Sequence, residues 1–192
     1  KIYTADYYYV KFFDSDNGVI VCGYAKSNDT NESSRIYSTS NGGESWDIVG
    51  SGPATNIIKG VVYVSSDVGF FCYDYVEGMD SNLYKTDDGG KTFAKVMLEE
   101  QELDSSAANP QGQETETKTD SGKNGADSSE QLRWGDVYKE ALTPVVDSTG
   151  IITIYLTQGK NAVYNDGKTA AKYQSSDKGS TWKYIGQVEI KD

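Results

Sequence analysis

The sequence predicts an all-β repeat protein, and three observations carry that prediction. An octet of residues recurs three times, and apolar segments of strand length follow acidic turns at matching places. In addition, no window of about 11 to 18 residues places apolar side chains at helical spacing behind a capping box. The octets are TSNGGESW at 39–46, TDDGGKTF at 86–93 and SSDKGSTW at 175–182.

Each of the three units is predicted to hold four strands in the same order. First strands precede the acidic turns, at 8–13, 60–64 and 142–146. The turns, at 16–18, 67–69 and 147–150, lead into apolar second strands at 19–22, 70–73 and 151–155. Third strands run into the octets at 35–38, 82–85 and 171–174, and last strands follow, as at 47–49 and 183–185. Three four-stranded units are therefore expected.

The third unit contains a further hairpin signal. Its Asn165-Asp-Gly167 sequence is typical of a type I′ turn, in which both central residues have positive φ. This turn predicts a hairpin between an arm containing Tyr164 and an arm at 168–173.

The octet has the chemistry of a tight turn with an aromatic anchor. Asn or Asp in third place can accept hydrogen bonds from N–H groups just ahead, and the glycine in fifth place supplies a positive φ. A hydroxyl in seventh place can bond the remaining turn groups, and the closing ring packs into a core or between sheets. The defining residues are Thr39, Asn41, Gly43, Ser45, Trp46, Thr86, Asp88, Gly90, Thr92, Phe93, Ser175, Asp177, Gly179, Thr181 and Trp182.

This octet resembles the Asp-box, or BNR repeat, of sialidases, sortilin-type receptors, some glucanases and photosystem II assembly factor-like proteins. All three copies match it at every defining position, with Asn allowed for Asp and Phe for Trp. The resemblance implies a β-propeller-type fold with the box between the third and fourth strands of a blade, on the rim away from the usual ligand face. The boxes are then structural, and contact of the box with carbohydrate or calcium is the rarer alternative.

The spacing of the octets predicts an insertion. Thr39 and Thr86 are 47 residues apart, but Thr86 and Ser175 are 89 apart. Residues 104–131 contain no large apolar or aromatic side chain, so they cannot bury enough surface to become ordered. We expect a mobile segment there, either a solvated linker or a processing or recognition segment. The chain then forms a single propeller-type domain with blades at about 1–52, 56–98 and 134–190.

Three blades fall short of a closed propeller, which typically uses about four to eight. We therefore expect a fragment or processed product from the carboxyl side of a longer protein. The alternatives are a homodimer that closes a six-bladed ring and an open arc with a protected edge.

Charge and composition exclude several partners. The net charge of −11 leaves no basic stripe for nucleic acid, and no run of about 18 apolar residues exists for membrane insertion. No signal peptide opens the sequence. Acidity, many tyrosines and few cysteines are typical of a secreted or cell-surface protein, which we expect to be bacterial.

Metal and cofactor sites are not predicted. The chain has no histidine and only two cysteines, too few for a Cys/His metal cluster. Cys22 and Cys72 occupy nearly equivalent strand positions, which favours buried free thiols over a disulfide between adjacent blades. The segment 14–18 resembles the start of a calcium loop, but Gly18 stands where a third ligand is needed and Ala25 where a glutamate is needed.

Catalytic residues are not assigned either. The lack of histidine removes the commonest general base and the usual nucleophile triads. Sialidases bind the substrate carboxylate with three arginines, and this chain has only Arg35 and Arg133. Paired carboxylates of a glycosidase cannot be singled out, and the acidic residues Asp74, Glu77, Asp80 and Glu140 are most simply solvated loop charges.

Aromatic residues give the remaining functional signal. Fifteen tyrosines exceed the needs of a small core, and exposed tyrosine is favoured at binding surfaces, although packing between blades is the simpler explanation. The candidate binding residues are Tyr73, Tyr75, Arg133 and Trp134. We expect a non-catalytic extracellular propeller segment for protein or glycan binding or for assembly. The alternative is part of a glycoside hydrolase whose remaining blades lie outside this sequence.

Overall fold

The structure is a computed structural model that describes residues 5–24, 34–103, 133–159 and 164–190. Within these ranges the chain forms three antiparallel sheets in sequence order. We call them sheet 1 (β1 to β4), sheet 2 (β5 to β8) and sheet 3 (β9 to β13). The predicted mobile segment 104–131 lies outside the described residues.

Sheet 1 is a meander in which each strand pairs with the next. Its β1 segment is rich in tyrosine and its β2 segment in valine and isoleucine, residues that suit a pleated surface. Asp14 ties the turn between them, because its carboxylate accepts hydrogen bonds from the N–H groups of Asp16 and Asn17. The strands are β1 (Tyr7–Phe12), β2 (Gly18–Gly23), β3 (Ser34–Thr39) and β4 (Asp47–Ser51).

Sheet 2 repeats this order, and its second strand is buried along its whole length. That strand reads GFFCY without polar alternation because it has a neighbouring sheet on each side. The strands are β5 (Ile58–Tyr63), β6 (Gly69–Tyr73), β7 (Leu83–Thr86) and β8 (Ala94–Lys95).

Sheet 3 differs from the prediction in its first strand. The segment 142–146, expected as one strand, is interrupted, and two short strands on either side of Pro144 pair with different parts of β11. Proline has no N–H to give to a ladder, which accounts for the break. The strands are β9 (Glu140–Ala141), β10 (Val145–Val146), β11 (Ile152–Thr157), β12 (Thr169–Ser175) and β13 (Lys183–Glu189).

Two short helical segments accompany sheet 3, although no helical periodicity predicts them. The single-turn helix α1 (Trp134–Val137) precedes β9, and η2 (Tyr164–Gly167) precedes β12. Inside η2, Asn165 and Asp166 have positive φ, and the Lys168 N–H donates to the Asn165 carbonyl. This segment is therefore a left-handed turn, as the Asn-Asp-Gly sequence predicted.

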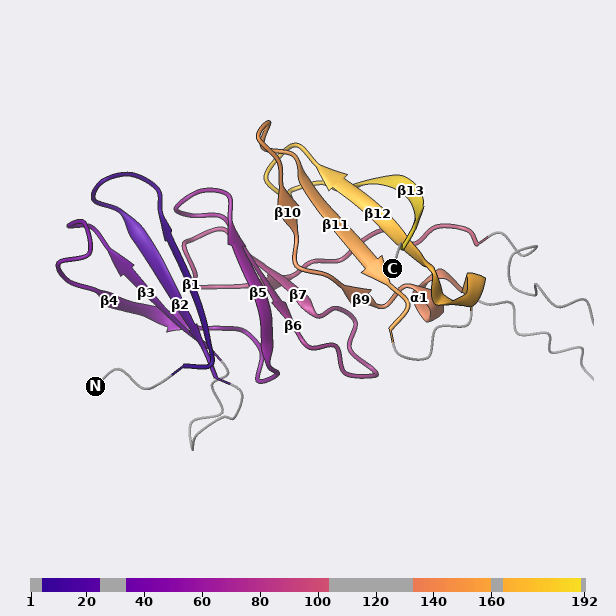
Figure 1. Cartoon of the computed structure of the whole chain (residues 1–192), viewed down its shortest axis with the longest axis horizontal. Helices are drawn as coiled ribbons and strands as arrows, with labels where there is room; N and C mark the ends of the chain where they lie inside the picture. The colour runs from indigo at the N-terminus through magenta and orange to yellow at the C-terminus, as the bar shows by residue number, and fades with distance from the viewer. Residues whose placement is uncertain (1–4, 25–33, 104–132, 160–163, 191–192) are drawn as a thin grey trace, which may run out of the picture.

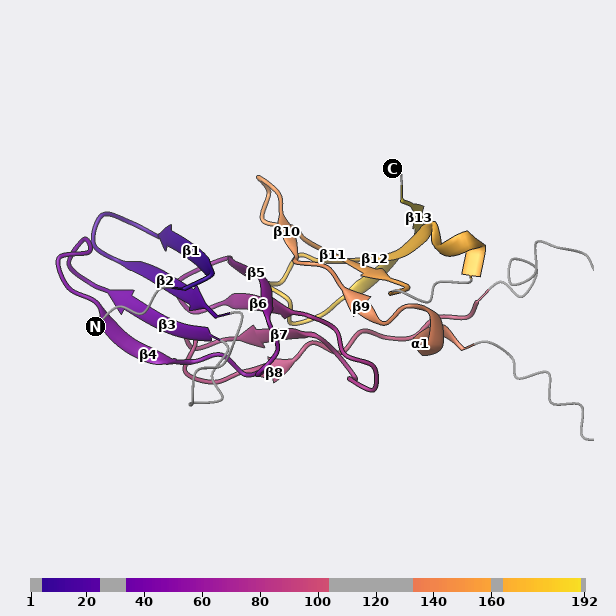
Figure 2. The ribbon, with the colours of Figure 1, turned by 60° about the horizontal axis from the view of Figure 1, so that its bottom comes forward.

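The three sheets lie side by side, with sheets 1 and 3 on opposite sides of sheet 2 (Figures 1 and 2). One core cluster lies between sheets 1 and 2, a second between sheets 2 and 3, and a third between sheet 3 and α1. We call the side of a sheet that faces the next sheet in sequence its forward face and the other side its back face. The predicted all-β fold of propeller-type, four-stranded blades is confirmed, and the blades form an open row.

A buried amide joins sheets 2 and 3. Asn82 donates to the carbonyls of Tyr73 and Ala141 at 2.8 and 2.9 Å, and its Oδ1 atom accepts the N–H of Ala141 at 2.8 Å. All three bonds are buried, so this side chain satisfies backbone groups that neither sheet pairs by itself.

No helix in the described ranges is long and apolar enough to cross a membrane.

Candidate functional site

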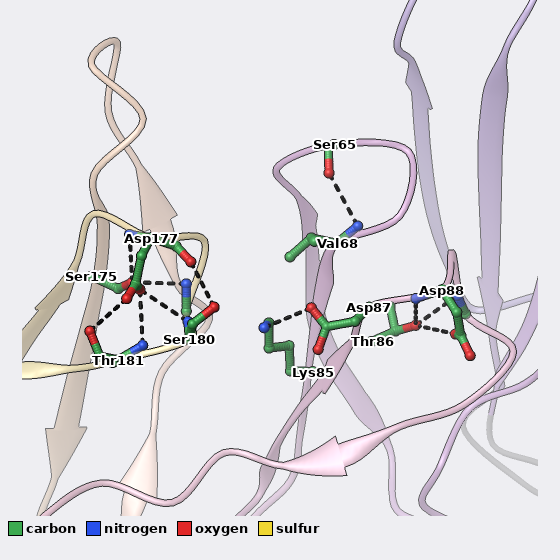
Figure 3. A network of polar contacts seen from close by, with 12 residues as sticks. Ser65, Val68, Lys85, Thr86, Asp87, Asp88, Ser175, Asp177, Ser180 and Thr181 are labelled. Carbon is green, nitrogen blue, oxygen red and sulfur yellow. Dashed lines mark hydrogen bonds and ion pairs between the residues drawn. The ribbon is translucent and has the colours of Figure 1, made fainter.

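The three octets form one and the same hydrogen-bonded turn, and Figure 3 shows those of sheets 2 and 3. The opening hydroxyl, on Thr39, Thr86 or Ser175, donates to the Oδ1 atom of the third residue at 2.7–2.9 Å. Its oxygen accepts the N–H of the fifth residue at 2.8–3.0 Å. The Oδ1 atom of the third residue also accepts the N–H of the seventh residue at 2.9–3.0 Å. Two side chains therefore close each turn.

The two aspartates hold their turns with a further bond. The Thr92 hydroxyl donates to the second carboxylate oxygen of Asp88, and the Thr181 hydroxyl donates to that of Asp177, each at 2.6 Å. Because these bonds favour the ionised form, they hold the pKa of both aspartates well below the usual range. In the octet of sheet 1, the uncharged amide of Asn41 takes the same place.

The backbone of the octets is left-handed at two consecutive residues. The predicted glycines have φ values of 91° at Gly43, 106° at Gly90 and 77° at Gly179. The residue before each glycine is also left-handed, and in the third octet it is Lys178, with φ 58°. A side chain in that conformation costs roughly 1–2 kcal/mol, so the surrounding hydrogen bonds must hold it in place.

The closing rings pack against protein. Trp182 crosses from sheet 3 to the Phe70 ring of sheet 2, with ring centroids 5.9 Å apart and planes at 77°. Phe93 packs on Phe71 at 4.9 Å, and Trp46 packs on Phe12 at 5.9 Å. Since the polar groups of each octet bond one another and its ring packs on a strand, the octets fasten the blades.

A groove of about 380 Å³ lies between sheets 2 and 3, at the end where β7 begins, whereas the octet of sheet 2 lies where β7 ends. Its floor is apolar and buried, and its rim comes from the loop between β6 and β7, the segment after β8, and α1. The lining residues include Tyr75, Met79, Leu83, Val96, Met97, Leu98, Arg133, Trp134, Tyr138 and Ala141.

Ion pairs compensate most of the charge around the groove. The Lys139 ammonium lies 2.9 Å from Glu77 and links the two sheets, and the Arg133 guanidinium bonds both carboxylate oxygens of Asp136. Asp80 binds Lys95 at 2.7 Å. These partners lower the pKa of Asp80 and Asp136, so both carboxylates are ionised acceptors.

The large rings of the groove are structural. The rings of Trp134 and Tyr138 are buried, with centroids 4.7 Å apart, and the Tyr138 hydroxyl bonds that of Thr169. Among the described residues the buried Trp134 indole N–H has no hydrogen-bond partner, although its approach to the Tyr173 hydroxyl acts to lower the pKa of Tyr173. Burial has the larger effect and raises the pKa of Tyr173 to about 12.

Three of the four candidate binding residues meet in the groove: Tyr75, Arg133 and Trp134. Tyr73 does not. It is fully buried between sheets 1 and 2, where its hydroxyl lies 2.9 Å from Ser34 Oγ, so it belongs to the core and cannot contact a ligand. Sequence reasoning missed Met79, Met97 and Lys139, which come from loops distant in sequence; the exposed methionines were the only local signal.

The charged candidates are not brought into a catalytic arrangement. Arg35 lies on β3 of sheet 1 and Arg133 beside α1, so the two arginines are on opposite ends of the row. Asp74 pairs with Lys59 at 2.7 Å. No group of three His, Cys, Asp or Glu side chains in the described part of the chain is placed to hold a metal ion.

The two cysteines are buried and free, but they do not point the same way. Cys22 pairs with Tyr8 and Arg35 on the back face of sheet 1, whereas Cys72 pairs with Leu83 on the forward face of sheet 2. Gly18 and Gly69 pair with the first residue of their octets, and Cys22 lies four residues after Gly18 whereas Cys72 lies three after Gly69. This difference of one residue in register reverses the face of a strand. Burial raises the pKa of Cys72 to about 11, so it is an unreactive thiol.

Comparison with known proteins gives a partial likeness to solved structures. No family profile matches the sequence, and no curated protein matches it. Among solved structures, the chain is similar to the crystal structure of a GH74 enzyme of Niastella koreensis, with a TM-score of 0.43 and 15% identity. The alignment covers 86% of this chain and 19% of that enzyme, and no activity is carried over from it.

Proposed function

We propose that the chain is a non-catalytic segment of an Asp-box β-propeller and that its groove between sheets 2 and 3 binds a segment of another protein. The identical hydrogen-bonded turns of the three octets support the Asp-box assignment. A secreted or cell-surface location, in a bacterium, is part of the proposal and rests on the acidic, tyrosine-rich and cysteine-poor composition together with the resemblance of the octets.

The observation that carries the binding role is the apolar rim of the groove. Met97 is 62% exposed, and Leu98, Met79 and Tyr75 are partly exposed beside it. Methionine is flexible and polarizable, so it adapts to the side chains of a protein partner. The paired charges around the rim leave apolar contact as the main source of affinity.

A protein segment fits this groove better than a glycan. Sugars are commonly bound by stacking on exposed rings, but Trp134 and Tyr138 are buried by their neighbours, and only Tyr75 offers part of its ring. Large apolar anchors on a peptide can instead enter above the buried side chains of Leu83, Val96 and Ala141.

The carboxyl groups argue against the hydrolase alternative. Glycoside hydrolysis needs one carboxylic acid with a raised pKa. In the described part of the chain, every carboxyl group with a shifted pKa has a lowered one, through hydrogen bonds or ion pairs. The alternative therefore depends on residues beyond those described.

The test is selection from a displayed peptide library on the intact chain, followed by measurement of affinity by calorimetry. We expect peptides with aliphatic or aromatic anchors, and a loss of at least about tenfold in affinity for Met97→Glu. Val76→Glu is the matched control, because Val76 is 54% exposed on the adjacent loop but does not line the groove. Equal binding to both variants, or binding of glycans alone on an array, would refute the proposal.

A further inference from the structure

The strand registers place equivalent residues of the blades on equivalent faces. In sheet 1, Val10, Ile20 and Tyr37 lie side by side on three strands; in sheet 2 the same places hold Val61, Phe71 and Tyr84. In sheet 3 they hold Ile154 and Tyr173. These residues belong to the back faces, and at these places they are aliphatic or aromatic in all three sheets.

The back faces of sheets 2 and 3 are covered by the sheet that precedes them in the chain. Val61 and Phe71 belong to the core shared with sheet 1, and Ile154 to the core shared with sheet 2. The back face of sheet 1 carries similar side chains but is open: Tyr8, Val10 and Phe12 are 55%, 56% and 45% exposed. An apolar row of this kind marks an interaction surface.

The edge of β1 is open in the same sense. On β5, the N–H groups of Val61 and Tyr63 donate to the hydroxyls of Tyr7 and Tyr9 of sheet 1, each at 3.1 Å. The pairing registers place Val10 and Phe12 of β1 where β5 has Val61 and Tyr63, so the amides of Val10 and Phe12 are the equivalent edge groups of sheet 1. No side chain in the described ranges bonds to either amide.

The other end of the row is built differently. The forward faces of sheets 1 and 2 carry Val19 and Phe70 on their second strands, and Ile36 and Leu83 on their third. Sheet 3 has Thr153 and Lys172 at these places, with Gln174 bonded to Thr153 at 3.1 Å. Val145 and Tyr155 share this face with them, but the polar residues replace the apolar pair that contacts the next sheet in sheets 1 and 2. Such a replacement is typical of a terminal, capping repeat.

We propose that the back face of sheet 1 docks a further four-stranded sheet of the same repeat, joined ahead of β1 in the same polypeptide. Its forward face presents aliphatic and aromatic side chains to Val10, Phe12 and Ile20, and two hydroxyl-bearing side chains bond the free amides of β1. The proposal continues the two existing interfaces, in which the covering sheet always comes earlier in the chain. A second copy does not fit in the same forward-to-back manner, because the free forward face that it offers is that of sheet 3, where Thr153 and Lys172 replace apolar residues.

The test adds a blade to the intact chain. A copy of residues 5–52 is fused ahead of the full sequence, with Tyr8→Thr and Val10→Lys in the copy so that its peptides differ in mass. We expect hydrogen exchange at the original Val10 and Phe12 amides to slow by at least about tenfold relative to the unfused chain. Unchanged exchange in β1, with the reference strand β6 still protected, would overturn the proposal.

Two controls keep the result decisive. Tyr7→Phe and Tyr9→Phe in the added copy remove the hydroxyls, so exchange at the two amides should become fast again. In the unfused chain, Val10→Lys should leave the unfolding midpoint unchanged, because Val10 is 56% exposed; a large decrease would contradict the proposal even if the fusion failed to fold. A dimer in sedimentation that Val10→Lys dissociates would also overturn it, in favour of a second copy.

Discussion

The hydroxyl of Tyr9 accepts a hydrogen bond of 3.1 Å from the backbone N–H of Tyr63, so a side chain of sheet 1 occupies the free edge of sheet 2. The two rings also stack, with centroids 6.2 Å apart. Since a covered amide without a partner is costly, the hydroxyl lets two sheets pack face to face at an edge strand.

Removing this hydroxyl should therefore weaken the chain although the ring remains. We expect Tyr9→Phe to lower the free energy of unfolding by about 1 kcal/mol, because the Tyr63 amide loses its acceptor. Tyr8→Phe is the control: its hydroxyl accepts an exposed N–H from Ala5, and its loss should cost less than about 0.5 kcal/mol. Urea titration of the three proteins measures both values, and equal losses would contradict the assigned role.

The Asn82 amide is expected to be the most sensitive polar group between sheets 2 and 3. Asn82→Ala leaves two carbonyls and one N–H buried without this partner, and we expect a loss of about 3 kcal/mol in denaturant titration. Gln174→Ala also removes a hydrogen bond donated by a side-chain amide, but this one lies on the partly exposed outer face of sheet 3. Its loss should cost less than about 0.5 kcal/mol. A loss below about 1 kcal/mol for Asn82→Ala would show that water replaces the side chain.

The two closing tryptophans, Trp182 and Trp46, should contribute differently to the free energy of unfolding although their octets are alike. Trp182→Ala removes a ring between two sheets and should destabilise by about 3 kcal/mol. Trp46 packs on the half-exposed Phe12 at the open face, so Trp46→Ala should cost only about 1 kcal/mol. Thermal or chemical unfolding distinguishes the two variants, and a reversed order would mean that the open face is covered.

The octets should also make stability depend on acid. The pKa values of Asp88 and Asp177 are lowered in the folded chain, so their contribution is full above the unfolded value near 4 and is lost as the pH falls below it. We expect the double variant Asp88→Asn, Asp177→Asn to lose less stability than the natural chain between pH 5 and pH 2. Parallel pH profiles of unfolding would contradict this assignment.

The sequence predicted the blades well because their signals are local. Acidic turns such as that at Asp147, and the paired left-handed residues of each octet, are specified within a few residues. The break around Pro144 also has a local cause, because proline lacks the N–H that a ladder needs. The Tyr73 assignment was wrong because β6 is buried on both faces, and the sheets that cover a strand come from parts of the chain distant in sequence.

The groove could be predicted only in part, because its two walls come from distant segments. Glu77 and Lys139, which link the two walls, are 62 residues apart in the sequence. The two hydrogen bonds between Asn82 and Ala141 also join residues that are 59 positions apart. Single-sequence patterns contain no information on such pairs. Tyr75, Arg133 and Trp134 were identified by residue type alone.

Strand β1 carries the hazard of an unprotected sheet edge. Its sequence, YYYVKF, combines strong β propensity with a single charge, Lys11, and its outer side chains are exposed. Such an edge is a template for strand addition and amyloid-like growth unless something shields it. Strand addition at residues 7–12 should therefore give open-ended aggregates of this chain rather than a discrete dimer, while the edge of β5, shielded by two tyrosines, does not take part.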